Sequence, residues 1–87
     1  MKTTKVKVNN PYGLHLRPSA KVVNAARSLK SKITLTFNKK TADSASILEI
    51  IALGATSGAE IEILAEGSDE NAAVQLFTEM FRDGAGI

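Results

Sequence analysis

The spacing of apolar residues is the feature that most constrains the fold of this chain. Apolar and polar residues alternate at 3–8, 33–37 and Glu60–Glu66, the pattern of strands with one buried face. From about Leu16 to Leu29 the apolar residues instead recur every three or four positions, which predicts a helix with one apolar face. Elements with one apolar face each must bury those faces against one another, so the pattern predicts a two-layer α+β sandwich.

Shorter segments supply two further elements. Turn-forming residues at Asn38–Lys40 predict a hairpin into a short third strand through Ala42. Ser46 then precedes the apolar run ILEIIAL, which Gly54 closes. A serine before such a run and a glycine after it are the usual ends of a helix, here of two turns.

The last predicted helix begins around Ser68-Asp69-Glu70, with a capping residue and an acidic first turn, and ends after Arg82 at Gly84. Its predicted inner face is Ala73, Leu76, Phe77, Met80 and Phe81. The order is therefore βαββαβα, and 87 residues predict one domain spanning 1–87.

Composition removes several classes of site. The chain has no cysteine and one histidine, so a zinc site would need three carboxylates beside that histidine. We therefore expect no metal and no cofactor. The N-terminal stretch MKTTKVKVNN has no apolar run, and no segment is long and apolar enough to span a bilayer. A cytoplasmic protein without membrane insertion is the expectation.

Charge is divided unevenly along the chain, although the net charge is only +2. Most cations are spread through the first half, at Lys2, Lys5, Lys7, Arg17, Lys21, Arg27, Lys30, Lys32, Lys39 and Lys40. The second half holds most of the acidic residues, namely Glu49, Glu60, Glu62, Glu66, Asp69, Glu70, Glu79 and Asp83. This division predicts one basic side, suited to an acidic protein partner.

The single histidine lies in the stretch NPYGLHLRPSAKVV, where a turn becomes a helix. Gly13 permits a tight approach to the helix, and Pro18 suits its first turn. Backbone N–H groups at a helix start lack intrahelical partners and carry the positive end of the dipole. A dianion carried on the ring of His15 would meet these donors and the guanidinium of Arg17. The residue types favour a phosphoryl group held briefly on the imidazole, and a solvated surface histidine is the plain alternative.

Three segments together resemble the HPr family, the histidine-containing phosphocarriers of the bacterial phosphotransferase system. They are GLHLRPSA, SILEIIALG and ILAEGSDENAAV, and the resemblance covers essentially the whole chain. It implies a carrier that is not an enzyme: His15 accepts a phosphoryl group from Enzyme I and passes it to enzyme II A domains in sugar uptake, assisted by Arg17. It also implies an open-faced β-sandwich with a four-stranded antiparallel sheet and three helices on one face.

The resemblance gives Ser46 a second role beside its helix cap. In many relatives the serine at this place is phosphorylated by an HPr serine kinase/phosphorylase, and the phosphorylated form binds a transcriptional regulator. A phosphate at a helix start adds charge without unfolding the domain. Ala45 stands before the serine, where a lysine would attract a phosphate, and Glu49 adds a negative charge one turn later. Both make this neighbourhood less favourable to a phosphate.

The short helix has more apolar residues than one buried face needs, which predicts a partner-binding surface. Its predicted members are Leu16, Ala20, Asn24, Arg27, Ile47, Leu48 and Ile51.

Other hypotheses remain open. The run S-I-L-x-I is also similar to the nitrogen-branch paralogue NPr, a regulatory phosphocarrier. The basic first half would suit a small nucleic-acid-binding α+β domain, but the chain has one tyrosine, no tryptophan and no G-x-x-G clamp, so we expect no nucleic acid partner. A small hydrolase using His15 would lack a nucleophile with a base in reach. A gel-shift at moderate salt separates the nucleic-acid hypothesis from the phosphocarrier.

Overall fold

The computed structural model describes residues 1–9, 13 and 16–82 of the chain. Within them the elements follow the predicted βαββαβα order. They are β1 (Lys2–Lys7), α1 (Leu16–Arg27), β2 (Lys32–Phe37), β3 (Lys40–Asp43), α2 (Ile47–Ala52), β4 (Glu60–Glu66) and α3 (Glu70–Arg82). In this described part, none of the helices has the length and apolar character needed to cross a membrane.

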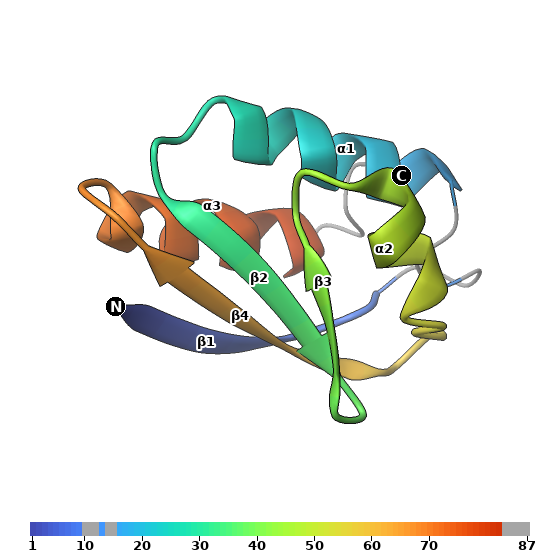
Figure 1. Cartoon of the computed structure of the whole chain (residues 1–87). Coiled ribbons are helices and arrows are strands. Elements are labelled where there is room, and N and C mark those ends of the chain that lie inside the picture. The colour runs from blue at the N-terminus through green and yellow to red at the C-terminus, as the bar shows by residue number, and fades with distance from the viewer. Residues whose placement is uncertain (10–12, 14–15, 83–87) are drawn as a thin grey trace.

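The four strands form one antiparallel sheet in the order β1-β4-β2-β3. Figure 1 shows α1 and α3 lying across one face of this sheet, with α2 beside the N-terminal half of α1. The predicted α+β fold, an open-faced sandwich with three helices, is confirmed. One helix bound differs from the prediction. Helix α1 ends at Arg27 and not near Leu29, because the N–H groups of Ser28 and Leu29 bond to carbonyls three residues back, at 3.2 and 3.1 Å. Helix α3 begins at Glu70, within the predicted start.

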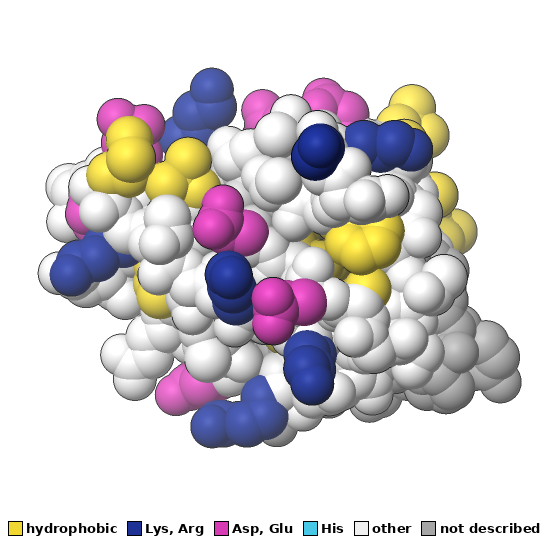
Figure 2. All heavy atoms as spheres, turned by 90° about the horizontal axis from the view of Figure 1, so that it is seen from below, with side chains coloured by type: hydrophobic (Ala, Val, Ile, Leu, Met, Phe, Trp, Pro, Cys, Tyr) yellow, Lys and Arg dark blue, Asp and Glu magenta, His cyan; other side chains and the backbone are white. Residues whose placement is uncertain are grey.

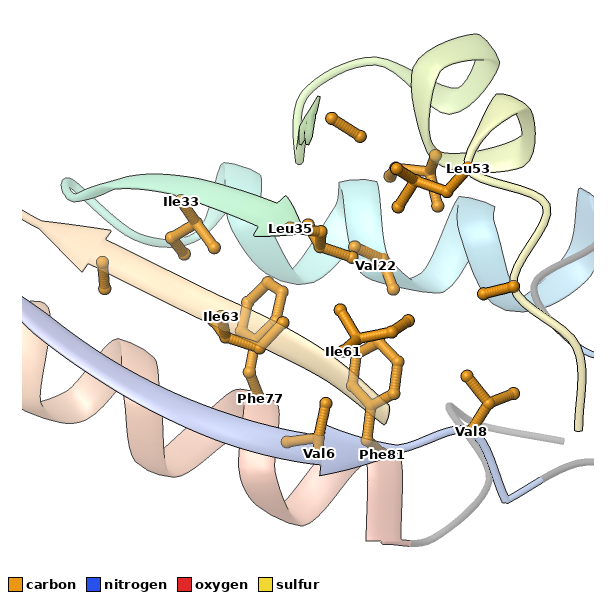
Figure 3. Close-up of a cluster of buried hydrophobic side chains, with 14 of the residues drawn as sticks. Val6, Val8, Val22, Ile33, Leu35, Leu53, Ile61, Ile63, Phe77 and Phe81 are labelled. Atoms are coloured by element: carbon orange, nitrogen blue, oxygen red, sulfur yellow. The ribbon is translucent and has the colours of Figure 1, made fainter. Parts of the chain in front are cut away.

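The core lies between the sheet and the helices, and Figure 3 shows Phe77 and Phe81 of α3 reaching into it. Ala73, Phe77 and Phe81 of α3 are fully buried because a spacing of four residues places them on one ridge of the helix. The prediction was wrong for Leu76, which is only half-buried and does not pack against the core, whereas its neighbour on the other edge of the stripe, Val74, does. Met80 is also half-buried, but it packs against the core.

The β2–β3 hairpin turns through Asn38 and Lys39, whose φ angles are 53° and 67°. Two successive residues with positive φ form the turn that matches the twist of a two-residue hairpin. Asparagine adopts this conformation more readily than most residues, so the predicted hairpin has a local cause.

The predicted division of charge does not produce a basic side on the sheet. Strand β4, from the acidic half, lies between β1 and β2, from the basic half. Directly opposed residues are Lys5 and Glu62, Lys7 and Glu60, and Lys32 and Glu66. Lys5 Nζ also lies 3.9 Å from Glu60 Oε1. Figure 2 shows Lys or Arg side chains next to Asp or Glu side chains over much of the face it presents. The pairing of the strands therefore mixes charges that the sequence separates.

Asp69 joins two connections that are distant in sequence. Its carboxylate accepts hydrogen bonds from the backbone N–H groups of Lys30 and Ser31, at 2.7 and 2.8 Å, and from the Ser31 hydroxyl. The bond from that hydroxyl is the largest cause of a pKa of Asp69 below its ordinary value, followed by the bond from the Lys30 backbone. The α1–β2 connection is thus held to the start of α3.

Candidate functional site

Gly13, in the segment that carries the histidine, is held tightly against the α2–β4 loop. It is buried, with a φ of 74°. A Cβ atom added there would lie 2.5 Å from the carbonyl oxygen of Ala55 and 2.9 Å from the Cα atom of Thr56. No side chain fits at such distances, so the backbone at Gly13 can approach this loop only because the residue is glycine.

The predicted phosphoryl acceptor, His15, lies outside the described residues. Two residues close to it in sequence are described, namely Gly13, two residues before it, and Leu16, the first residue of α1, directly after it. Leu16 is 66% exposed and Arg17 is also exposed, whereas Pro18 is buried in the first turn of α1. The first turn of α1 has no acidic residue, so the N-terminal end of this helix keeps its positive dipole end uncompensated by a carboxylate of its own. This arrangement suits an anion near Arg17.

An open hollow of about 560 Å³ lies on the outer side of α1, lined by Leu16, Arg17, Ala20, Lys21 and Asn24. Among the described residues that line this hollow, Arg17 and Lys21 are the charged ones, and both are positive. Lys21 is a lining residue that the sequence analysis did not select. The sequence could have identified it, because Lys21 lies four positions after Arg17 and three positions before Asn24. Residues with these spacings share one face of a helix.

Apolar side chains are exposed on α2, which packs against α1. Leu48 is 81% exposed and Ile51 is 36% exposed, whereas Ile50 is fully buried. Ile47 is half-buried and packs against the core. On α1, Asn24 and Arg27 are exposed and Ala20 is half-buried. We call the surface formed by Leu16, Ala20, Asn24, Arg27, Ile47, Leu48 and Ile51 the α1–α2 surface.

Ser46 is the N-cap of α2. Its Oγ accepts a hydrogen bond from the backbone N–H of Glu49, at 3.3 Å, and its own N–H donates to the carbonyl oxygen of Asp43, at 3.0 Å. The Glu49 carboxylate accepts from the backbone N–H of Asp43 at 3.1 Å. Two acidic residues therefore take part in the hydrogen bonds around this cap.

In residues 1–9, 13 and 16–82, no three His, Cys, Asp or Glu side chains lie close enough together to hold a metal ion.

The chain is similar to known proteins along most of its length. Residues 2–83 match the family model described as "PTS HPr component phosphorylation site". The chain is 37% identical over 54 residues to phosphocarrier protein HPr of Buchnera aphidicola, covering 62% of this chain and 64% of that protein. It is 43% identical over 54 residues to the multiphosphoryl transfer protein of Haemophilus influenzae, covering 59% of this chain and 11% of that protein. The matches thus span just under two thirds of the first relative and about a tenth of the second.

Among solved structures, the crystal structure of HPr-C-His from Thermoanaerobacter tengcongensis superposes with a TM-score of 0.93 at 31% identity, covering 100% of this chain and 98% of that one. The fold, the glycine–histidine–arginine–proline segment at the start of α1 and the match over residues 2–83 agree. This chain belongs to the HPr family of the phosphotransferase system.

Proposed function

We propose that this chain is a phosphocarrier that receives a phosphoryl group on His15 from Enzyme I and delivers it to enzyme II A domains. The observation that carries the proposal is the placement of the chain's one histidine directly before α1, followed by the exposed Arg17, within a region that matches the phosphorylation-site family model. The carrier role and the absence of an enzymatic activity of its own belong to the same proposal.

The transfer chemistry follows from these groups. A ring nitrogen of His15 forms a bond to phosphorus while the bond to the donor group of Enzyme I breaks, and the delivery step reverses these roles with the acceptor domain. The resulting P–N bond is labile because the imidazole is a good leaving group. Arg17 compensates part of the charge of the transferred group by charge-assisted hydrogen bonds, and the open end of α1 contributes its dipole.

Incubation with Enzyme I and phosphoenolpyruvate tests the proposal. We expect a mass gain of one phosphoryl group, with a label that is stable in alkali and labile in acid, and no label on His15→Ala. An Arg17→Ala variant should fold normally and accept the group roughly tenfold or more slowly, since charged hydrogen bonds contribute about 1.5–3 kcal/mol. Label retained by His15→Ala would refute the assignment of the acceptor.

The α1–α2 surface is the proposed docking site for both partners. Exposed Leu48 and Ile51 supply an apolar centre, and the acid-free α1 supplies a positive flank for an acidic partner. A surface of this kind suits a transient complex, which a carrier needs in order to be released.

A leucine substitution separates docking from folding. Leu48→Ser should raise the KM for Enzyme I with little change in thermal stability, because the side chain is already 81% exposed. Leu76→Ser on α3 makes the same chemical change outside the surface, at a half-buried side chain, and it should leave the KM unchanged when the variants are compared at equal folded fraction. Equal KM values for Leu48→Ser and the unaltered chain would exclude this surface as the docking site.

Phosphorylation of Ser46 is the proposed point of regulation, with an HPr serine kinase/phosphorylase and a transcriptional regulator as the additional partners. The hydroxyl stands at the start of α2, where a phosphate would meet backbone N–H groups, while Asp43 and Glu49 oppose the added charge. Incubation with the kinase should label Ser46 but not a Ser46→Ala variant, and the label should slow transfer to His15. Failure to label would leave Ser46 as a cap only.

The sugar branch and the nitrogen branch are distinguished by the donor. Sugar-branch Enzyme I should phosphorylate the chain faster than its nitrogen-branch counterpart does. The opposite preference would assign an NPr-type regulatory role.

A further inference from the structure

A second hollow lies between the outer strand β3 and helix α2. Its volume is about 360 Å³, and it is lined by Lys40, Thr41, Glu49, Ala52 and Leu53. Figure 1 shows α2 beside β3, which is the last strand of the sheet. None of the five lining residues belongs to the α1–α2 surface. A volume at the lower end of the usual range for ligand pockets suits a small metabolite.

The backbone of Thr41 offers two free hydrogen-bonding groups at this hollow. Opposed residues of two antiparallel strands alternate between pairs that are hydrogen-bonded and pairs that are not. The N–H of Ser44 donates to the carbonyl oxygen of Ile33, which lies opposite it, at 3.0 Å. Counting back from this bonded pair, Thr41 and Thr36 form an unbonded pair. The N–H and carbonyl oxygen of Thr41 therefore point away from β2, and neither is bonded to another residue of the described part of the chain.

This free part of the edge is one residue long. The next residue with outward groups is Asp43, whose N–H donates to Glu49 Oε1 at 3.1 Å and whose carbonyl oxygen accepts from the N–H of Ser46 at 3.0 Å. In the other direction the chain turns at Asn38 and Lys39. An extended peptide that adds to a sheet pairs with several residues of the edge strand. A single free N–H and carbonyl pair instead matches the carboxylate and ammonium groups of one amino acid.

Opposite charges border the hollow without neutralising each other. Lys40 and Glu49 both line it, and no ion pair joins them in residues 1–9, 13 and 16–82. Glu49 is held in place, because its carboxylate accepts from the N–H of Asp43 and its own N–H donates to Ser46 Oγ at 3.3 Å. An acid that is already fixed binds a cationic group at a smaller entropic cost than a mobile one. The pair of charges therefore suits a zwitterion.

The remaining lining is apolar. Leu53 is 3% exposed and belongs to the core, and Ala52 is exposed beside it. An apolar side chain that lies against these two residues is removed from water, which favours binding. Among zwitterionic amino acids, the hollow thus favours those with an aliphatic side chain.

We propose that this hollow binds a free α-amino acid with an aliphatic side chain. The ligand carboxylate accepts from the N–H of Thr41 and pairs with Lys40. The ligand ammonium donates to the carbonyl oxygen of Thr41 and to the second carboxylate oxygen of Glu49. The ligand side chain lies against Leu53 and Ala52. This site is separate from the proposed phosphoryl transfer and does not depend on it.

Titration of the ¹⁵N-labelled chain with L-leucine, followed by NMR, tests the proposal. We expect saturable shifts of the backbone amide resonances of Thr41 and Leu53, which line the hollow. N-acetyl-leucine lacks the ammonium group and leucine amide lacks the carboxylate. Each should bind at least about tenfold more weakly than leucine, because each loses a charge-assisted hydrogen bond.

Two variants of the chain remove one charge each from the hollow. Lys40→Gln and Glu49→Gln should each raise the Kd for leucine about tenfold or more. Glutamine at position 49 keeps an oxygen that accepts from the N–H of Asp43, so the variant retains the bonds around the start of α2. The matched controls are Lys39→Gln and Glu79→Gln, on exposed residues that do not line the hollow. Both should leave the Kd within about twofold of the unaltered chain.

The outcomes are distinct. Absence of saturable shifts with leucine, or a Kd that changes equally in the two hollow variants and their controls, overturns the site. Equal Kd values for leucine and N-acetyl-leucine overturn the zwitterionic ligand. A blocked tripeptide, acetyl-alanyl-valyl-alanine amide, that binds as tightly as leucine would assign the edge to an extended chain and also overturn the proposal. Since the titration involves neither Enzyme I nor His15, each of these results leaves the proposed function intact.

Discussion

Replacing Gly13 with alanine should destabilise the chain more than the same replacement at either of two other glycines. Gly13, Gly54 and Gly58 all have positive φ angles, of 74°, 70° and 85°. An alanine therefore incurs a similar backbone strain of about 1–2 kcal/mol at each position. Only at Gly13 does the new Cβ also overlap backbone atoms, 2.5 Å from the Ala55 oxygen, whereas nothing lies within 4 Å at Gly54 or Gly58.

The overlap sets the size of the expected difference. Relieving it requires the backbone on one side to move, and overpacking of this kind costs about 1–3 kcal/mol. We expect a loss in the free energy of unfolding of about 2–5 kcal/mol for Gly13→Ala and about 1–2 kcal/mol for Gly54→Ala and Gly58→Ala. For a domain of this size each kcal/mol corresponds to roughly 4–8 °C in Tm.

Urea unfolding followed by circular dichroism measures all three variants under one condition. The two control glycines share the positive φ, so subtracting their effect isolates the close approach between Gly13 and the α2–β4 loop. Losses that agree within about 0.5 kcal/mol across the three variants would show that this approach does not constrain the backbone. A tenfold drop in phosphoryl acceptance by Gly13→Ala under fully folded conditions would further connect the contact with the placement of His15.

Three further predictions concern stability. The bonds to Asp69 lower its pKa from the ordinary 3.8, so their contribution to the free energy of unfolding is complete above pH 3.8 and is lost as the pH falls through the folded-state pKa. In urea unfolding at pH 7 and below pH 3.8, the free energy of unfolding should therefore depend less on pH in Asp69→Asn than in the unaltered chain. Ser46→Ala should cost about 1 kcal/mol by loss of the α2 cap, and an unchanged urea midpoint would contradict that role. Ile50→Ala should cost about 2–5 kcal/mol and Leu48→Ala less than about 0.5 kcal/mol, since only the first is buried; equal midpoints would disprove the assignment of the faces of α2.

Periodicity predicted the elements well because each has a local cause. The alternation in Glu60–Glu66 and the serine and glycine around α2 depend on neighbouring residues only, and all appear at the predicted places. The charge pattern did not predict the surface of the sheet, because that surface depends on strand order and nothing local indicates that β4 lies between β1 and β2. On α1, whose residues are contiguous in sequence, the basic character persists. The predicted burial of Leu76 was wrong for a related reason. A broad apolar stripe on a helix does not indicate which of its two edges faces the sheet.

The candidate site was predictable where a sequence motif marks it and not where distant segments meet. The arginine and proline of the motif identify the start of α1 from adjacent residues alone. The contact of Gly13 with Ala55 and the bond from Asn9 to Arg82 join segments 42 and 73 positions apart (55 − 13 = 42). The neighbouring residues in sequence do not indicate such contacts, because each residue of the pair is also common in ordinary turns or at helix ends.

The hydrogen bonds around Asp43 have a consequence for the solution behaviour of the sheet. Strand β3 is an outer strand, and an outer strand can recruit a strand from another molecule through its unpaired backbone groups. At Asp43 both groups are already occupied: the N–H by the Glu49 side chain and the carbonyl oxygen by the N–H of Ser46. Ser46 and Glu49, at the start of α2, thus occupy the backbone groups of Asp43 that an incoming strand would need. We expect Glu49→Ala, which frees the N–H of Asp43, to increase edge-to-edge association through β3 in concentrated protein.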